Sequence, residues 1–395
     1  MKINQKIDER ELRARIGQTF DFGVAQLAKM LPQWTSDKPA PIYTENGVWS
    51  RPGFIWTDWC PGFYAGMMWL AYERTGQTQW REAAEAYTRK LEPRKFDRDV
   101  HDLGFIFMTT ANRWHNLLPD GDATKQWLRE LLITAGTTQA LRWKDTGEEH
   151  YLYSFNGPQS LFIDIMMNIG LLFRAHQLGG EEELYRKAVT HARTTEKYLI
   201  RKAGDRLVDG DGKVIHEAIF NPARGEFRNL SSQQGYSPFT CWARGLAWAM
   251  YGFTDTYRFT QDPLFLETAE RCAGYYLENT PAGGVPFWDY GAPNIPDEPL
   301  DSSAAAIAAG ALWKLKDIAG TRRGAETYRR AALTILATLT GKEFTGDSSR
   351  DGILRHGVYH KPMNWGVDES VMWGDYFFME VLRAVLAEGF PPPGS

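Results

Sequence analysis

A single carboxylate, Asp164, lies inside one of the most apolar stretches of the chain. The stretch from Ser154 to Phe173 reads SFNGPQSLFIDIMMNIGLLF, so Asp164 has an isoleucine on each side. An unpaired carboxylate kept charged among such neighbours would cost several kcal/mol. It must therefore be partnered, face a cavity or carry a proton. Asp164 is for this reason the first candidate for chemistry.

A second carboxylate, Asp102, follows His101 and precedes another apolar run, LGFIFM. If the fold brings Asp102 and Asp164 together in an aromatic-lined cleft, burial and like-charge repulsion raise the pKa of one of them. The pair then offers a proton donor near neutral pH beside a charged partner. The spacing alone is equally compatible with a catalytic role and with a structural role for the two carboxylates.

The stretch between residues 216 and 248 adds groups that suit an anionic ligand. His216 is a titratable donor and Gln234 is an amide. Arg244 is a fixed cation whose fork can pair with a planar carboxylate through two parallel hydrogen bonds. Trp242 and Trp248 could form aromatic walls that stack on a ligand ring.

Structural interpretations compete with each of these roles. Trp248 follows Arg244 by one helical turn, and core packing explains it equally well. Arg244, in an otherwise apolar helix, could belong to a buried ion pair. Trp56 and Trp143 are further wall candidates from loops, or else core residues. Three other acidic residues before apolar helices are interpreted as helix N-caps, worth about 1 kcal/mol each: Asp58, Asp301 and Asp368.

These residues must be positioned by helices, because helical periodicity dominates the chain. Apolar residues recur at steps of three and four between residues 8 and 31. From Pro61 an apolar helix, a turn and a more polar helix follow one another, and this unit recurs four more times in degenerate form. Its second helix carries an aromatic residue one turn in, and these aromatics are 47 to 80 residues apart: Trp80, Trp127, Tyr185, Phe265 and Tyr328. Such loose spacing indicates a common helical hairpin with variable loops.

The two ends of the chain each supply half of a sixth hairpin. The helix at residues 8–31 has no helix before it, and the last helix, WGDYFFMEVLRAVL, has none after it. Pairing them closes a ring, so the sequence predicts an all-α fold, an (α/α)6 toroid forming a single domain over residues 1–395. The longer loops enter the inner helices from the same side. We expect them to carry short β hairpins, one of them around Asp209 to Lys213, and to build a cleft at one mouth of the toroid.

Composition excludes several partners. The net charge is −4 and no basic run interleaves with aromatics, so nucleic acid is not expected to bind. The three cysteines, Cys60, Cys241 and Cys272, form no CxxC pair, which argues against a disulfide framework or a zinc site. The amino terminus lacks a signal-peptide core, and no stretch is long enough to span a membrane. We therefore expect a cytoplasmic protein, and we infer no obligate protein partner.

Four segments resemble a known family, the unsaturated glucuronyl hydrolases of glycoside hydrolase family 88. They are VHDLGFIF, FIDIMMN, QQGYSPFTCWARGLAWAMYGF and VDESVMWGDYFFMEVL, and the similarity runs over most of the chain. The resemblance implies a six-hairpin toroid that needs no metal or other cofactor. It implies a hydrolase that removes a 4,5-unsaturated uronic acid from the non-reducing end of lyase-generated oligosaccharides.

The resemblance also implies roles for single residues. Asp164 matches the general acid/base of the family and Asp102 its second essential carboxylate, with Asp164 expected to be the neutral member of the pair. The positions that resemble its substrate-binding residues are His216, Gln234, Arg244, Trp56 and Trp248. His101 and Trp242, which lie within the same motifs, are further substrate-binding candidates. Trp143 is placed less securely because its loop varies. Ser370, in VDESVMW, is a candidate for contact with the adjoining sugar.

The implied chemistry is hydration of a vinyl ether: a proton adds to C4, water adds at C5, and the resulting hemiketal opens. The preferred substrates are fragments of the glycosaminoglycan type. Three alternatives stay open: an unsaturated rhamnogalacturonyl hydrolase acting on pectin fragments, a sugar epimerase or isomerase on the same toroid, and a helical-repeat scaffold. The isomerase would use His101 and His216, whereas the scaffold would need tighter repeats and shorter loops.

Overall fold

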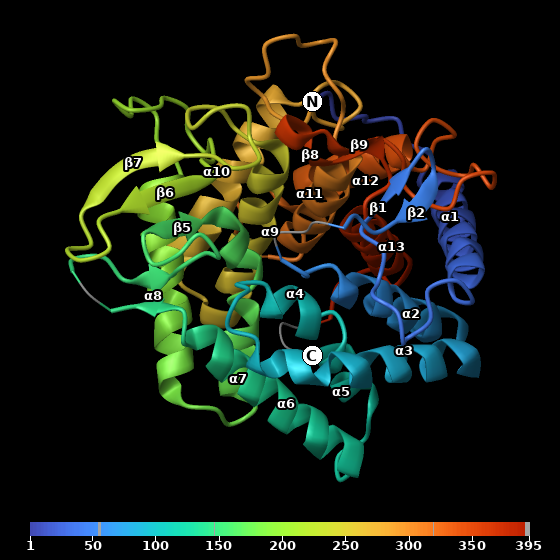
Figure 1. Cartoon of the computed structure of the whole chain (residues 1–395). Helices are drawn as coiled ribbons and strands as arrows, with labels where there is room; N and C mark the ends of the chain where they lie inside the picture. Colours follow the sequence, from blue (N-terminus) through green and yellow to red (C-terminus); the bar gives the residue numbers. More distant parts are fainter. Residues whose placement is uncertain (54–56, 146, 319, 392–395) are drawn as a thin grey trace.

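The structure is a computed structural model that describes residues 1–53, 57–145, 147–318 and 320–391. Within these residues the helices form a double-layered ring of six hairpins (Figure 1). The inner layer consists of α2 (Pro61–Thr75), α4 (Leu103–Phe107) with α5 (Ala111–Leu117), the 3₁₀ helix η2 (Ile163–Met167) with α7 (Gly170–Gln177), α9 (Ala243–Thr260), α11 (Ser302–Leu315) and α13 (Met372–Leu386). The outer layer consists of α3 (Thr78–Leu91), α6 (Ala123–Ala140), α8 (Glu182–Leu199), α10 (Pro263–Asn279), α12 (Ala325–Leu339) and α1 (Glu9–Met30).

Burial explains which helices are inside. Every residue of α11, SSAAAIAAGALWKL, is buried, and its alanines and glycine let neighbouring helices approach closely. A helix that is apolar all round must lie in the core of a large protein. The outer helix α3 is buried along one stripe only, which includes Trp80 and Tyr87. The inner helices therefore make the core, and the outer ones cover it.

The ring closes where the two ends of the chain meet, as predicted. Helix α1 packs against α13, and α13 in turn contacts both α11 and α2. The Arg13 guanidinium donates hydrogen bonds to the carbonyl oxygens of Val385 (3.2 Å) and Leu386 (2.7 Å) at the end of α13. The first and last helices thus form the sixth hairpin.

Short antiparallel sheets occupy the loops that lead into the inner helices. The strands are β1 (Tyr43–Glu45) with β2 (Val48–Ser50), β3 (Trp143–Lys144) with β4 (Tyr151–Leu152), β5 (Ser160–Phe162) with β6 (Glu217–Phe220) and β7 (Phe227–Ser231), and β8 (Gly357–His360) with β9 (Trp365–Glu369). Two further 3₁₀ turns are η1 (Glu92–Phe96) and η3 (Lys361–Met363). Each sheet precedes an inner helix, so the sheets gather at one mouth of the ring, as expected. The segment from Asp209 to Lys213 is a turn instead of a pair of strands; a single bridge between Ile200 and Val214 lies beside it.

The three acidic residues interpreted as helix caps behave differently. Asp301 is the N-cap of α11 and accepts hydrogen bonds from the backbone of Ser303 (3.1 Å) and Ala304 (3.4 Å). The other two do not cap. Asp58 instead forms ion pairs with Arg51 and Arg94, and Asp368 pairs with His356. An acidic side chain in a loop pairs with the cation that the tertiary fold places beside it, even where the sequence suggests a helix cap.

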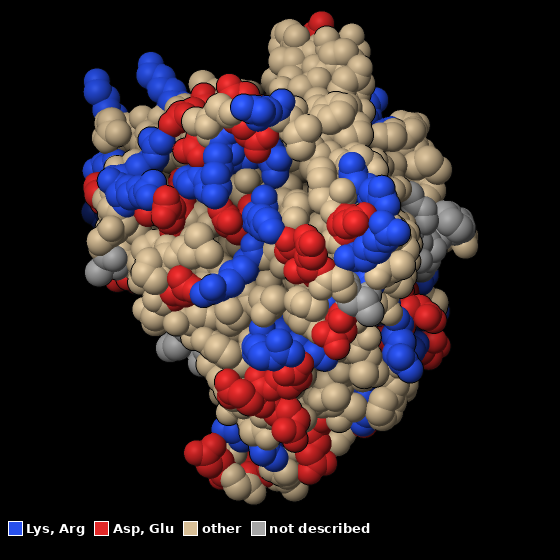
Figure 2. Space-filling model, turned by 90° about the vertical axis from the view of Figure 1, so that its left-hand side faces the viewer, with Lys and Arg blue, Asp and Glu red and all other residues tan. Residues whose placement is uncertain are grey.

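The surface carries charges of both signs. On the face shown in Figure 2, lysine and arginine side chains are interspersed with aspartate and glutamate. In the part of the chain that the structure describes, no helix is long and apolar enough to cross a membrane.

Candidate active site

Strand pairing places Asp164 beside His216. In the sheet, Phe162 at the end of β5 pairs with Glu217 at the start of β6. The backbone N–H of Ile163 then donates to the carbonyl oxygen of His216 (3.0 Å), which extends the ladder by one more bond. Asp164 follows directly, in the 3₁₀ helix η2, and His216 precedes β6. His216 Nε2 lies 3.4 Å from Asp164 Oδ2, at the long end of hydrogen-bonding range.

A buried asparagine joins the segments that carry the two carboxylates. Asn168 Oδ1 accepts a hydrogen bond from the backbone N–H of Phe105 (2.9 Å) in α4, and Asn168 Nδ2 donates to the carbonyl oxygen of Asp164 (3.2 Å). The contact is close because Gly104 has no side chain. A Cβ there would lie 2.5 Å from Asn168 Cα. Asp102, the residue before α4, is thereby held next to η2.

Both carboxylates line one pocket at the mouth of the ring. Its lining consists of Thr57, Trp59, His101, Asp102, Phe105, Phe155, Phe162, Asp164, Gln234, Arg244 and Tyr359. Asp102 and Asp164 are buried, with 4% and 9% of their surface exposed. The predicted juxtaposition of two carboxylates in an aromatic-lined cleft is therefore confirmed as geometry.

Each carboxylate faces a histidine in a defined tautomer. His101 Nδ1 accepts a hydrogen bond from the backbone N–H of Phe155 (3.1 Å), and His216 Nδ1 accepts one from Gln233 (3.0 Å). A ring nitrogen that accepts cannot carry the proton, so both neutral rings carry it on Nε2. In His101 this nitrogen lies 3.3 Å from Asp102 Oδ1. Burial lowers the pKa of His101 to about 3, so this ring stays neutral.

Asp102 is the member of the pair whose pKa is raised. Burial raises the pKa of Asp102 to about 7, with the charge of Asp164 as the next cause, although a hydrogen bond with Thr57 acts in the opposite direction. Below about pH 7 this carboxyl is therefore mostly neutral.

Asp164, by contrast, is held in its charged form. Burial alone would raise its pKa, but the contact with His216 Nε2 and the positive charge of Arg244 outweigh it, so the pKa is lowered. These pKa directions are opposite to the expectation that Asp164 is the neutral member of the pair. The positive charge of Arg244 lowers the pKa of Asp164, whereas the negative charge of Asp164 raises that of Asp102.

Arg244 combines the two roles that its sequence context left open. It is almost completely buried, lies 3.6 Å from Asp301, and donates to the carbonyl oxygens of Val358 (2.5 Å) and Tyr359 (2.8 Å). It also donates to Gln234 Oε1 (2.5 Å), and both residues line the pocket. Arg244 Nε is buried and has no hydrogen-bond partner among the described residues.

Several predicted aromatic contacts lie elsewhere. Trp248 is a core residue packed against Phe105, with ring centroids 5.1 Å apart. Trp242 lies between the His216 ring (centroids 4.7 Å apart) and the Arg244 guanidinium (4.3 Å from the Trp242 ring centroid), behind the pocket wall. Trp143 in β3 stacks on His150, away from the pocket lining.

Two further candidates also fall outside the pocket lining. The side chain of Ser370 is buried, and its backbone N–H donates to Thr44 Oγ1 (2.9 Å). Trp56 lies outside the described residues.

The aromatic walls come instead from residues that the motifs did not single out. Trp59, Phe105, Phe155, Phe162 and Tyr359 line the pocket. Trp59, Phe155 and Tyr359 belong to the long segments between helices that were expected to build the cleft, and this expectation was the available signal. Which aromatic in such a loop turns inward depends on strand register, which composition does not reveal. Among the described residues, no three His, Cys, Asp or Glu side chains gather as a metal site would need.

Comparisons with known proteins give a consistent result. The family model for Glycosyl Hydrolase Family 88 matches residues 29–281. An unsaturated glucuronyl hydrolase from Formosa agariphila is 34% identical over 82% of this chain and 79% of its own length. An unsaturated chondroitin disaccharide hydrolase from Streptococcus pneumoniae is 31% identical over 94% of this chain and 91% of its own.

Solved structures agree over nearly the whole chain. The unsaturated glucuronyl hydrolase from Bacillus sp. GL1, described as responsible for the degradation of glycosaminoglycan, superposes with a TM-score of 0.83 at 27% identity, covering 94% of this chain and 96% of that one. An unsaturated glucuronyl hydrolase specific for heparin superposes with a TM-score of 0.82, also at 27% identity, covering 93% and 96%.

Proposed function

Because the chain belongs to Glycosyl Hydrolase Family 88, we propose that it removes the 4,5-unsaturated uronic acid from the non-reducing end of glycosaminoglycan-type oligosaccharides. The names of its relatives support this substrate class: they include unsaturated glucuronyl hydrolases, unsaturated chondroitin disaccharide hydrolases and an enzyme specific for heparin. One relative was solved with a disaccharide of unsaturated glucuronic acid and a sulfated N-acetylgalactosamine.

The observation that carries the proposal is the position of two buried carboxylates, Asp102 and Asp164, in one pocket. The pKa of Asp102 is raised to about 7 and that of Asp164 is lowered, so the pair shares one proton below about pH 7. Vinyl ether hydration needs one acid that delivers a proton and then, as a base, accepts one from water. A pair that holds a single proton meets this requirement.

Substrate binding would move the proton toward Asp164. His216 and Arg244 favour the charged form of Asp164. When the uronate carboxylate pairs with these donors, Asp164 loses part of that stabilisation and its pKa rises. Asp164 then holds the proton at the moment when the double bond of the substrate is in place. Asp102 serves as its reservoir and as a hydrogen-bond partner for the sugar.

The steps balance with water as the only co-reactant. Asp164 transfers its proton to C4, and positive charge develops at C5 and the ring oxygen. Water adds at C5 and returns a proton to Asp164. The hemiketal then opens to a ketone at C5, and the C1–oxygen bond to the leaving sugar breaks as C1 becomes an aldehyde. Trp59 and Tyr359 offer ring faces on which the sugar can stack.

A panel of unsaturated disaccharides tests the proposal. Disaccharides from chondroitin, hyaluronan and heparin, sulfated and unsulfated, would be compared with those from gellan and rhamnogalacturonan, following the loss of absorbance of the conjugated double bond. We expect turnover of glycosaminoglycan disaccharides. Activity on the rhamnose-linked compound alone would assign the chain to pectin breakdown. A product with its glycosidic bond intact would indicate an isomerase.

A further inference from the structure

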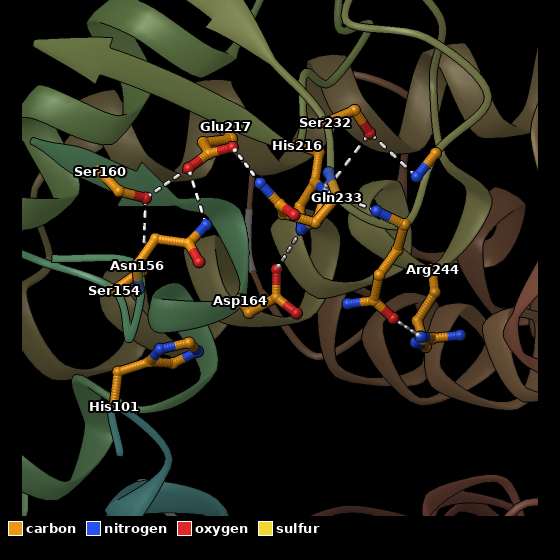
Figure 3. A network of polar contacts seen from close by, with 12 residues as sticks. His101, Ser154, Asn156, Ser160, Asp164, His216, Glu217, Ser232, Gln233 and Arg244 are labelled. Atoms are coloured by element: carbon orange, nitrogen blue, oxygen red, sulfur yellow. Dashed lines mark hydrogen bonds and ion pairs between the residues drawn. The ribbon is translucent and has the colours of Figure 1, made fainter. Parts of the chain in front are cut away.

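We propose that Glu217 is a positioning residue that holds both active-site histidines in their working tautomers; the inference rests on the proposed function. Glu217 is the first residue of β6, directly after His216, and only 1% of its surface is exposed. Its side chain does not line the pocket. It lies behind the wall, where the loops that orient His101 and His216 meet (Figure 3).

Three neutral side chains donate hydrogen bonds to the Glu217 carboxylate. Ser160 Oγ (2.6 Å) and Asn156 Nδ2 (3.2 Å) donate to Oε1. Gln233 Nε2 (3.2 Å) donates to Oε2. Burying a carboxylate on neutral donors is costly compared with an apolar residue of similar size, so stability alone does not account for it. Each oxygen instead holds a different loop.

The first oxygen holds the loop that orients His101. Ser160 Oγ also bonds Ser154 Oγ (2.6 Å), and Ser154 Oγ accepts from the backbone N–H of Asn156 (3.1 Å). Phe155 lies between these two anchored residues, and its backbone N–H donates to His101 Nδ1. The direction of that N–H is thus set by bonds on both sides of Phe155.

The second oxygen holds the loop that orients His216. The side chain of Gln233 is bound by Glu217, while the backbone N–H of the same residue donates to His216 Nδ1 (3.0 Å). The proton of each histidine is consequently kept on Nε2, facing Asp102 in one case and Asp164 in the other. Through these hydrogen bonds the Glu217 carboxylate fixes the Nε2-protonated tautomer of both His101 and His216.

The test compares Glu217→Gln with Gln233→Met. Glu217→Gln replaces the carboxylate that accepts the Gln233 Nε2 hydrogen bond with an amide. Gln233→Met removes the same Gln233–Glu217 hydrogen bond but keeps the backbone N–H that donates to His216. Because Gln233 is partly exposed, this variant remains informative if Glu217→Gln fails to fold. Glu270→Gln is the matched control, because Glu270 is also buried and accepts from Tyr328 Oη (3.1 Å) far from the pocket.

We expect both test variants to lower kcat by about 10-fold or more with a smaller change in KM. The alkaline limb of the pH profile should move upward, because Asp164 loses the contact with His216 Nε2 that lowers its pKa. Glu270→Gln should lower the melting temperature and leave kcat and the pH profile unchanged. Wild-type kcat and pH profile in both test variants would overturn the proposal, as would an equal kcat loss in Glu270→Gln.

A readout without substrate separates this inference from the proposed function. Nitrogen chemical shifts of labelled histidine report which ring nitrogen carries the proton. His101 and His216 should be protonated on Nε2 alone in the wild type, and His216 should show a mixture of tautomers in Glu217→Gln. Unchanged tautomers would overturn the positioning role even in an active enzyme. Wild-type inactivity on every unsaturated disaccharide would instead count against the proposed function.

Discussion

Two aspartates with the same intrinsic acidity have opposite protonation states in this pocket. Their burial is similar, so the difference in pKa comes from their neighbours: the positive charge of Arg244 lowers the pKa of Asp164, whereas the negative charge of Asp164 raises that of Asp102. Removing each carboxylate should therefore have distinct effects.

Asp164→Asn should abolish turnover, with a loss of at least about 10³-fold in kcat, because an amide can neither deliver a proton to C4 nor accept one from water. Substrate binding should persist, since the ring walls and Arg244 are untouched. Steady-state kinetics and calorimetric titration with an unsaturated disaccharide would check this. A variant with near-normal kcat would remove Asp164 from its assigned role.

Asp102→Asn should lower activity and yet stabilise the protein at neutral pH. The raised pKa of Asp102 means that its contribution to stability is full below about pH 4 and is lost as the pH rises toward 7. Asparagine resembles the neutral carboxyl and avoids this loss, which amounts to at most about 4 kcal/mol. The melting temperature of the variant should exceed that of the wild type at pH 8 and match it near pH 4. A pH-independent difference would contradict the raised pKa.

Among the elements, the junction of α4 with η2 sets the spacing of the two carboxylates. Gly104→Ala should push α4 away from Asn168, because the new Cβ would lie 2.5 Å from a backbone atom that has no freedom to move aside. We expect a clear loss of stability and a fall in kcat larger than the change in KM.

The control for that substitution is Gly17→Ala in α1. A Cβ at Gly17 would meet nothing within 4 Å, so alanine should stabilise the helix by up to about 1 kcal/mol without affecting kcat. Denaturant unfolding and kinetics of both variants distinguish a local spacing effect from a general effect of glycine replacement. Normal kcat in Gly104→Ala would show that the junction tolerates displacement.

The helices and the ring that they form could be predicted from the sequence much better than the side-chain contacts in the pocket. Helical periodicity and two unpaired terminal helices were enough to predict the closed ring, because apolar faces must be covered. The positions of Asp102 and Asp164 followed from their apolar surroundings. Trp143 and Ser370 lie outside the pocket lining because their side-chain directions depend on strand pairing, with β4 for Trp143 and with β1 for Ser370. The protonation order was missed because it depends on donors brought in from residue 216 onward.

At the scale of the whole molecule, the active site depends on a ring closed without a covalent link. Phe20 on α1 is fully buried in the core. Phe20→Ala should cost about 3–5 kcal/mol in the free energy of unfolding, through lost burial and a cavity. The exposed neighbour Gln18 offers a control, since Gln18→Ala should change it by less than about 0.5 kcal/mol. Similar urea midpoints for both variants would contradict a closing role for α1.

The central claim is that the enzyme protonates C4 and hydrates C5 instead of attacking the anomeric carbon. The most direct measurement is NMR of the initial product formed in D₂O. We predict one deuteron at C4, added to a single face, together with loss of the double bond, and neither in Asp164→Asn. A released uronic acid that retains its C4=C5 double bond and carries no deuterium would contradict the account.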